Sequence, residues 1–177
     1  MTDTETKCLD TFPEWLRTLS ADAGDLADII GDTGVSEGQR TYAAAALNYV
    51  FKSLDLIPDG IEDLGYLDDA FVLRVACALA AKDEGKTAPI IERLAQDAEL
   101  IANLLGGDYL RLENYVNKLK GGAARGRTVG EIISDEAIQR DFMNEVRGWA
   151  TSYEAPSFNK DEKNLVKLKS FLSAKLP

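Results

Sequence analysis

A short acidic segment between two apolar helical patterns constrains the fold of this chain more than any other feature. The two patterns cover residues 36–54 and 66–82, and the second is apolar on nearly every side, as in a helix that is buried on most faces. Between them, residues 55–69 read DLIPDGIEDLGYLDD, with six carboxylates and no basic residue. Because Pro58 has no backbone N–H and disfavours helix at the preceding residue, the chain should turn there. The sequence therefore predicts a helical hairpin with an acidic corner.

Apolar residues at helical spacing recur along the rest of the chain. Near the N-terminus the pattern predicts two short helices, the first from Pro13 to about Ser20. No strand alternation or hairpin turn signal is found, so the predicted fold class is all-α, with about seven or eight helices around the central hairpin. We expect one compact domain made of four stretches, residues 1–35 (N-terminal helices), 36–85 (hairpin core), 86–155 (packing helices) and 156–177 (a basic amphipathic helix).

Charge is unevenly distributed and limits the expected partners. The net charge is −10; residues 1–110 carry 21 acids and 8 bases, whereas residues 111–177 carry 9 acids and 12 bases. An acidic front part repels phosphate backbones and anionic lipid head groups, so neither nucleic acid nor a membrane surface is the expected partner. The apolar stretches are also shorter than the roughly 18 residues that a membrane span needs. We expect a protein partner, and the oligomeric state stays open.

The two cysteines and the first residues indicate a cytoplasmic protein. Cys8 and Cys77 have no spacing typical of a disulfide framework or a metal knuckle. Cys77 falls in an apolar run and should be buried, whereas Cys8 should be exposed near the chain end. The start, MTDTETKCLD, lacks the basic and apolar regions of a signal peptide.

Catalytic residue types are scarce. The chain has no histidine, which excludes His-based triads and His-ligated zinc. Two carboxylates can perform acid–base chemistry, but only across a cleft of suitable width. Since no nucleophile and base motif is found either, we expect a protein that is not an enzyme.

The acidic corner resembles a known family. Residues 47–75, LNYVFKSLDLIPDGIEDLGYLDDAFVLRV, resemble the YkvA-like family, domain of unknown function 1232, whose core reads approximately P-x-D-L-I-P-D-x-I-P-x-x-G-x-x-D-D. Ser53 and Glu62 stand where the family has proline, which favours a more helical and more hydrophilic corner. The resemblance implies a helix, an acidic corner and a second helix, with no activity established for the family. The matching positions are Asp55, Leu56, Ile57, Pro58, Asp59, Ile61, Gly65, Asp68 and Asp69.

Two interpretations of the corner follow from its residues. In the first, four carboxylates bind a hard cation such as Ca²⁺ or Mg²⁺, which takes oxygen ligands, although the EF-hand spacing is not met. In the second, Asp59 and Asp68 are helix N-caps, and Asp55 or Asp69 bonds to backbone N–H groups or pairs with a base such as Lys52 or Arg74. The candidate metal ligands are Asp55, Asp59, Asp68 and Asp69.

Two functions are accordingly considered. The first is a non-enzymatic interaction or regulatory module without a cofactor, and the second is a divalent-cation-binding protein that uses the acidic corner. For the first, the loop GGAARGR at residues 121–127 offers a basic contact for an acidic partner, through Arg125 and Arg127 together with Lys118 and Lys120.

Overall fold

The computed structural model describes residues 1–52, 55–58, 60–61, 63–83 and 85–177. In these ranges the chain forms eight α-helices, one short 3-10 helix and one hairpin of two very short strands, so the all-α fold class is confirmed. The elements are α1 (Asp3–Ile30), α2 (Glu37–Val50), α3 (Leu67–Ala80), α4 (Pro89–Leu105), α5 (Asp108–Lys118), η1 (Leu119–Gly121), β1 (Ala123–Ala124), β2 (Arg127–Thr128), α6 (Val129–Ser134), α7 (Glu136–Ser152) and α8 (Glu162–Lys175).

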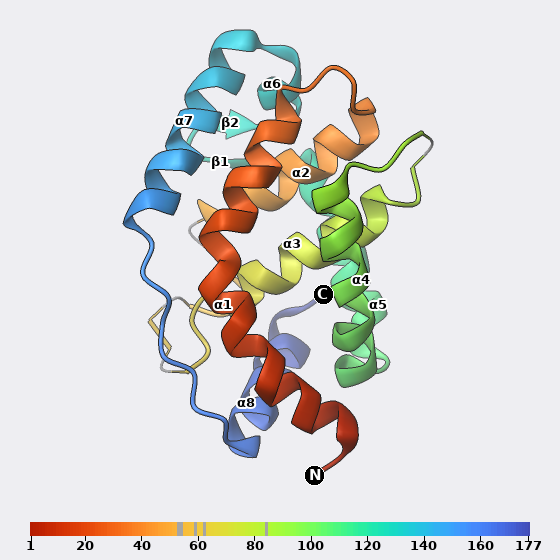
Figure 1. Ribbon diagram of the computed structural model, residues 1–177, viewed down its shortest axis with the longest axis vertical. Coiled ribbons are helices and arrows are strands. Elements are labelled where there is room, and N and C mark those ends of the chain that lie inside the picture. The colour runs from red at the N-terminus through yellow and green to blue at the C-terminus, as the bar shows by residue number, and fades with distance from the viewer. Residues whose placement is uncertain (53–54, 59, 62, 84) are drawn as a thin grey trace.

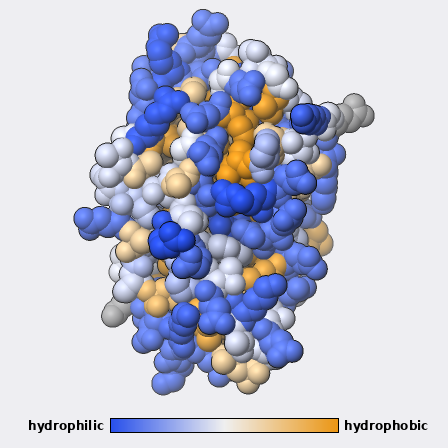
Figure 2. All heavy atoms as spheres, in the orientation of Figure 1, coloured by the Kyte–Doolittle hydropathy of each residue, from blue (hydrophilic) through white to orange (hydrophobic). Residues whose placement is uncertain are grey.

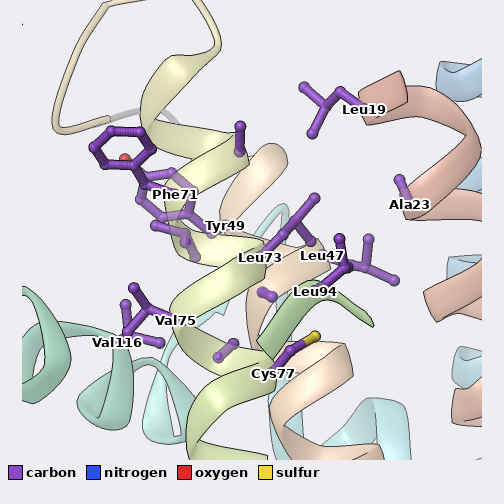
Figure 3. Close-up of a cluster of buried hydrophobic side chains, with 14 of the residues drawn as sticks. Leu19, Ala23, Leu47, Tyr49, Phe71, Leu73, Val75, Cys77, Leu94 and Val116 are labelled. Carbon is purple, nitrogen blue, oxygen red and sulfur yellow. The ribbon is translucent and has the colours of Figure 1, made fainter. Parts of the chain in front are cut away.

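Helix α3 lies at the centre, as its nearly uniform apolar sequence predicts. It packs against α1, α2, α4 and α5, and within it only Ala78 and Leu79 are not buried. Figure 3 shows this arrangement, with Leu47 of α2, Leu94 of α4 and Val116 of α5 directed toward the side chains of α3. Because α3 is surrounded on most sides, the acidic residues in its first turn are carried into the interior.

Helix α1 is one helix of 28 residues, so the expectation of two short helices was wrong. It runs along most of the long axis of the molecule in Figure 1. Pro13 lies inside it and removes one helical hydrogen bond, at a cost of about 3 kcal/mol. Leu9, Phe12 and Leu16 bury one continuous face across that proline, at about 1.5–3 kcal/mol each, which outweighs the cost.

The start of α1 is ordered by a capping box. The side chain of Thr2 accepts a hydrogen bond from the Glu5 amide, and the Glu5 side chain accepts one from the Thr2 amide. Cys8, on the second turn, is completely buried, so its expected exposure was also wrong. The helix begins ten residues before Pro13, and its first turns are part of the hydrophobic core.

The rear helices cover the long helix along its length. Figure 1 shows α7 beside the C-terminal part of α1 and α8 near its N-terminal part, with residues 153–161 running between them. On the opposite side, α4 packs against both α1 and α3, and α5 packs against α3. Helix α4 has Pro89 at its first position, and α7 is capped by Asp135, which accepts hydrogen bonds from two amides of the first turn.

The loop at residues 121–127 contains a small hairpin that the sequence did not predict. Arg125 and Gly126 both have positive φ, 50° and 79°, which is the pattern of a type I′ turn between antiparallel strands. The guanidinium groups of Arg125 and Arg127 both pair with the Glu145 carboxylate on α7. These two arginines are therefore not the free basic contact that we expected.

The face of the molecule drawn in Figure 2 is mainly hydrophilic, with a hydrophobic area toward its upper end. Across the described ranges, no helix combines the length and the hydropathy required to cross a lipid bilayer.

Candidate metal centre at the acidic corner

The acidic corner, residues 55–69, is a series of tight turns between α2 and α3. The Ile61 amide donates to the Pro58 carbonyl at 3.1 Å, and the Gly65 amide donates to the Ile61 carbonyl at 3.0 Å. Asp63 and Tyr66 have left-handed backbones, with φ of 64° and 67°. A non-glycine residue in that region costs about 1–2 kcal/mol, so contacts around the corner must hold these conformations.

Those contacts come from the rear of the chain. The ring of Tyr66 lies 5.3 Å from the ring of Tyr153 and 6.4 Å from that of Trp149, both at the end of α7. The amide of Asn159, just before α8, donates to the Asp63 carboxylate at 3.2 Å. Two segments about a hundred residues away in sequence therefore fix the path of the corner.

Three of the four predicted metal ligands meet in this corner. Asp55, Asp68 and Asp69 each place one carboxylate oxygen so that the three atoms lie within 4.8 Å of one another. Asp68 and Asp69 are only 1% and 2% exposed, whereas Asp55 is half-buried. The fourth candidate, Asp59, lies outside the described residues.

A tyrosine that the sequence analysis did not single out organises the cluster. The Tyr49 hydroxyl, on the last turn of α2, donates to Asp68 Oδ2 at 2.5 Å and accepts a hydrogen bond from the Leu56 amide at 2.7 Å. The Ile57 amide also points to Asp68 Oδ2, at 3.4 Å. Asp68 is thus not an N-cap, because α3 begins at Leu67 and Asp68 bonds back to the preceding helix and turn.

The carboxylates affect the acidity of the surrounding phenols. Burial raises the pKa of Tyr49, and the nearby charges of Asp68 and Asp69 raise it further. Burial, followed by Asp55 and Asp68, raises the pKa of Tyr115 to about 12. Both shifts have the sign expected in a buried region of negative charge, which disfavours a further anion and favours a cation.

Arg74, considered above as a partner for Asp55 or Asp69, forms ion pairs with two other carboxylates. Its guanidinium is buried, with Nε 3.0 Å from Asp97 Oδ2 on α4 and Nη2 3.7 Å from Asp22 Oδ2 on α1, and it lies over the ring of Trp15. These contacts join α3 to its two neighbours on that side. The other base that we considered, Lys52, has its Nζ 5.5 Å from the centre of the Tyr115 ring.

The geometry of the three oxygens suits one hard cation. Ligands of one Ca²⁺ ion, at calcium–oxygen distances of about 2.3–2.6 Å, lie at most about 5.2 Å apart, and the three oxygens lie within 4.8 Å of one another. Ca²⁺ accepts several carboxylate ligands, whereas Mg²⁺ is usually bound through one or two carboxylates and retains several waters. Three protein oxygens would leave the remaining coordination positions of either ion for water or backbone carbonyls.

The corner coincides with the segment that a family comparison detects. Residues 39–74 match the family described as Protein of unknown function (DUF1232). The expected resemblance to domain of unknown function 1232 is thereby confirmed for this segment, which covers most of α2, the corner and the first half of α3. Comparisons with curated proteins and with solved structures gave no match. In this chain the DUF1232 segment therefore supplies the central hairpin, while the helices that surround it lie outside the matched residues.

Proposed function

We propose that this protein binds a divalent cation, Ca²⁺ in preference to Mg²⁺, between the carboxylates of Asp55, Asp68 and Asp69. The observation that carries the proposal is the convergence of three carboxylate oxygens within 4.8 Å, two of them from almost fully buried side chains. Oxygen donors of this kind are the ligands that hard cations take in proteins.

Electrostatics supports a cation at this position. Two ionised carboxylate oxygens no more than 4.8 Å apart repel each other by at least about 3 kcal/mol at an effective dielectric constant of about 20. A divalent cation between the three groups replaces this repulsion with attraction. The raised pKa values of Tyr49 and Tyr115 are consistent with the same local excess of negative charge.

The role that fits this position is structural. Asp55 precedes the turn at Pro58, whereas Asp68 and Asp69 belong to the first turn of α3, so an ion shared by them joins the two sides of the hairpin. The corner lies where the central helix begins, and stabilising it stabilises the start of that helix. A cation bound only by the folded protein raises its free energy of unfolding.

Thermal unfolding in EDTA and in excess CaCl₂, MgCl₂ or MnCl₂ tests this function. At a free Ca²⁺ concentration one hundred times the Kd, the stabilisation is about 2.7 kcal/mol. For a chain of this length that corresponds to a rise in Tm of roughly 5–11 °C. We expect the largest rise in Ca²⁺ and a smaller one in Mg²⁺.

Two substitutions in the same corner make the test specific. Asp69→Asn keeps the side-chain shape but removes a ligand charge, so it should abolish most of the Ca²⁺-dependent rise in Tm. Asp63→Asn removes the same charge a few residues away, retains an oxygen for the Asn159 amide, and tolerates the left-handed backbone. Asp63→Asn should therefore retain the rise. The proposal fails if EDTA and Ca²⁺ give the same Tm for the unmodified protein, or if the two variants respond alike.

A further inference from the structure

A cleft distant from the acidic corner in the fold has an excess of basic residues in its lining. It lies where α1 ends and where α6 leads into α7, at the upper end of the molecule in Figure 1, and it has a volume of about 490 Å³. Volumes of about 300–1,000 Å³ are typical of small-molecule sites. The polar residues of its lining include Thr33, Arg40, Ser134, Gln139, Arg140 and Arg147.

The positive charge of this cleft contrasts with the rest of the chain. The net charge of the protein is −10, yet the lining contains three arginines against one acid, Glu136. Arg40 comes from α2, whereas Arg140 and Arg147 lie two turns apart on α7. The charge is therefore assembled by the fold, since the two helices are about a hundred residues apart in sequence.

The guanidinium groups of the three arginines differ in the hydrogen bonds and ion pairs that hold them. Arg40 is half-buried, and its Nε donates to the Ile30 carbonyl at 2.9 Å, which fixes the guanidinium plane at the end of α1. Arg147 is held by Asp28, with Nη2 2.8 Å from Oδ1. Arg140 is exposed, and its guanidinium makes no hydrogen bond or ion pair with any residue in the described ranges, although Glu136 lies one turn before it on α7. The cleft thus contains one arginine that is not held by an ion pair.

We propose that this cleft binds a small anion that carries a phosphate group. Guanidinium groups match phosphate oxygens with two parallel hydrogen bonds. The hydroxyl of Thr33 and the second N–H of the Gln139 amide, whose first is donated to the Ile132 carbonyl, supply additional donors for such a ligand. A volume of about 490 Å³ suits a small molecule. This inference does not depend on the cation site, since none of its residues belongs to the acidic corner.

An NMR titration of isotopically labelled protein with inorganic phosphate and with pyrophosphate tests the inference. EDTA is kept present, so that a metal ion at the acidic corner cannot bridge the anion to the protein. We expect pyrophosphate to shift the signals of the cleft residues, with an affinity that falls as NaCl is raised, because partly exposed charges are screened by salt. Arg140→Ala should weaken binding about tenfold or more, which is the value of one hydrogen-bonded charge contact.

The matched control is Arg17→Ala. Arg17 is an exposed arginine paired with Glu14 on α1, and its position is about 20 Å from the end of that helix. Its removal changes the net charge equally and should leave the affinity within about twofold. Equal affinity in Arg140→Ala and in the unmodified protein, or absence of shifts at millimolar pyrophosphate, would overturn the inference. Binding of an octaglutamate peptide without binding of pyrophosphate would also overturn it and would assign the cleft to an acidic protein segment.

Discussion

Removing one hydroxyl, in Tyr49→Phe, tests whether the acidic corner is held to α2 as the structure indicates. The substitution keeps the buried ring and deletes two hydrogen bonds, the one donated to Asp68 and the one accepted from the Leu56 amide. A hydrogen bond to a charged group contributes about 1.5–3 kcal/mol, and a buried donor left without its partner costs about 1–3 kcal/mol. We therefore expect the free energy of unfolding to fall by about 3 kcal/mol.

The assay is urea unfolding followed by circular dichroism, with a thermal melt in parallel. A loss of about 3 kcal/mol corresponds to a decrease in Tm of roughly 6–12 °C for a protein of this size. Tyr115→Phe is the matched control, because its ring contacts Tyr49 edge-on and its hydroxyl makes no hydrogen bond within the described residues. The control should stay within about 0.5 kcal/mol of the unmodified protein. Equal stabilities for the two variants would refute the assignment of Tyr49 as the residue that holds the corner.

Two further predictions concern the core. Arg74→Met should lower the free energy of unfolding by about 3 kcal/mol in urea, because it removes the buried guanidinium that is hydrogen-bonded to Asp97 and lies 3.7 Å from the carboxylate of Asp22, which is 3% exposed. Arg17→Ala, which breaks an exposed pair with Glu14, should cost at most about 1 kcal/mol, and the reverse order would contradict the structure. Burial raises the pKa of Cys8 to about 11 and that of Cys77 to about 12, above the value of about 8.5 for a thiol in the unfolded chain. Since the folded state holds these thiols protonated, their contribution to stability is complete below about pH 8.5 and is lost as the pH rises toward 11–12. Between about pH 9 and pH 11, the free energy of unfolding should therefore fall less for a Cys8→Ala/Cys77→Ala variant than for the unmodified protein. Equal pH dependence of the free energy of unfolding in the two proteins would contradict this role of the buried thiols.

The central hairpin was predictable because its signals are local. Ser36 is a residue type favoured at helix N-caps and caps α2, with the Gln39 amide 3.2 Å from its hydroxyl, and the uniform apolar sequence of α3 indicates burial on most sides. The N-terminal helix was mispredicted for the converse reason. Pro13 is a strong local signal for a helix start, and it was outweighed by the burial of side chains on both sides of it, which depends on the tertiary structure.

The candidate site was predictable only in part. The density of carboxylates without a base made Asp55, Asp68 and Asp69 candidates, and the turns of the corner bring them together. The role of Tyr49 was not predictable, because a tyrosine on the apolar face of a helix is most simply a core residue, and its hydroxyl reaches Asp68 only once the chain has reversed direction. The same holds for the basic cleft, whose arginines come from distant helices.

The central claim is that a metal ion occupies the acidic corner, and anomalous diffraction from crystals soaked in MnCl₂ tests it most directly. The account predicts one strong anomalous peak at about 2.1–2.6 Å from carboxylate oxygens of Asp55, Asp68 and Asp69, absent from crystals of Asp69→Asn. Well-defined electron density for the three carboxylates without an anomalous peak between them, at millimolar Mn²⁺, would contradict it.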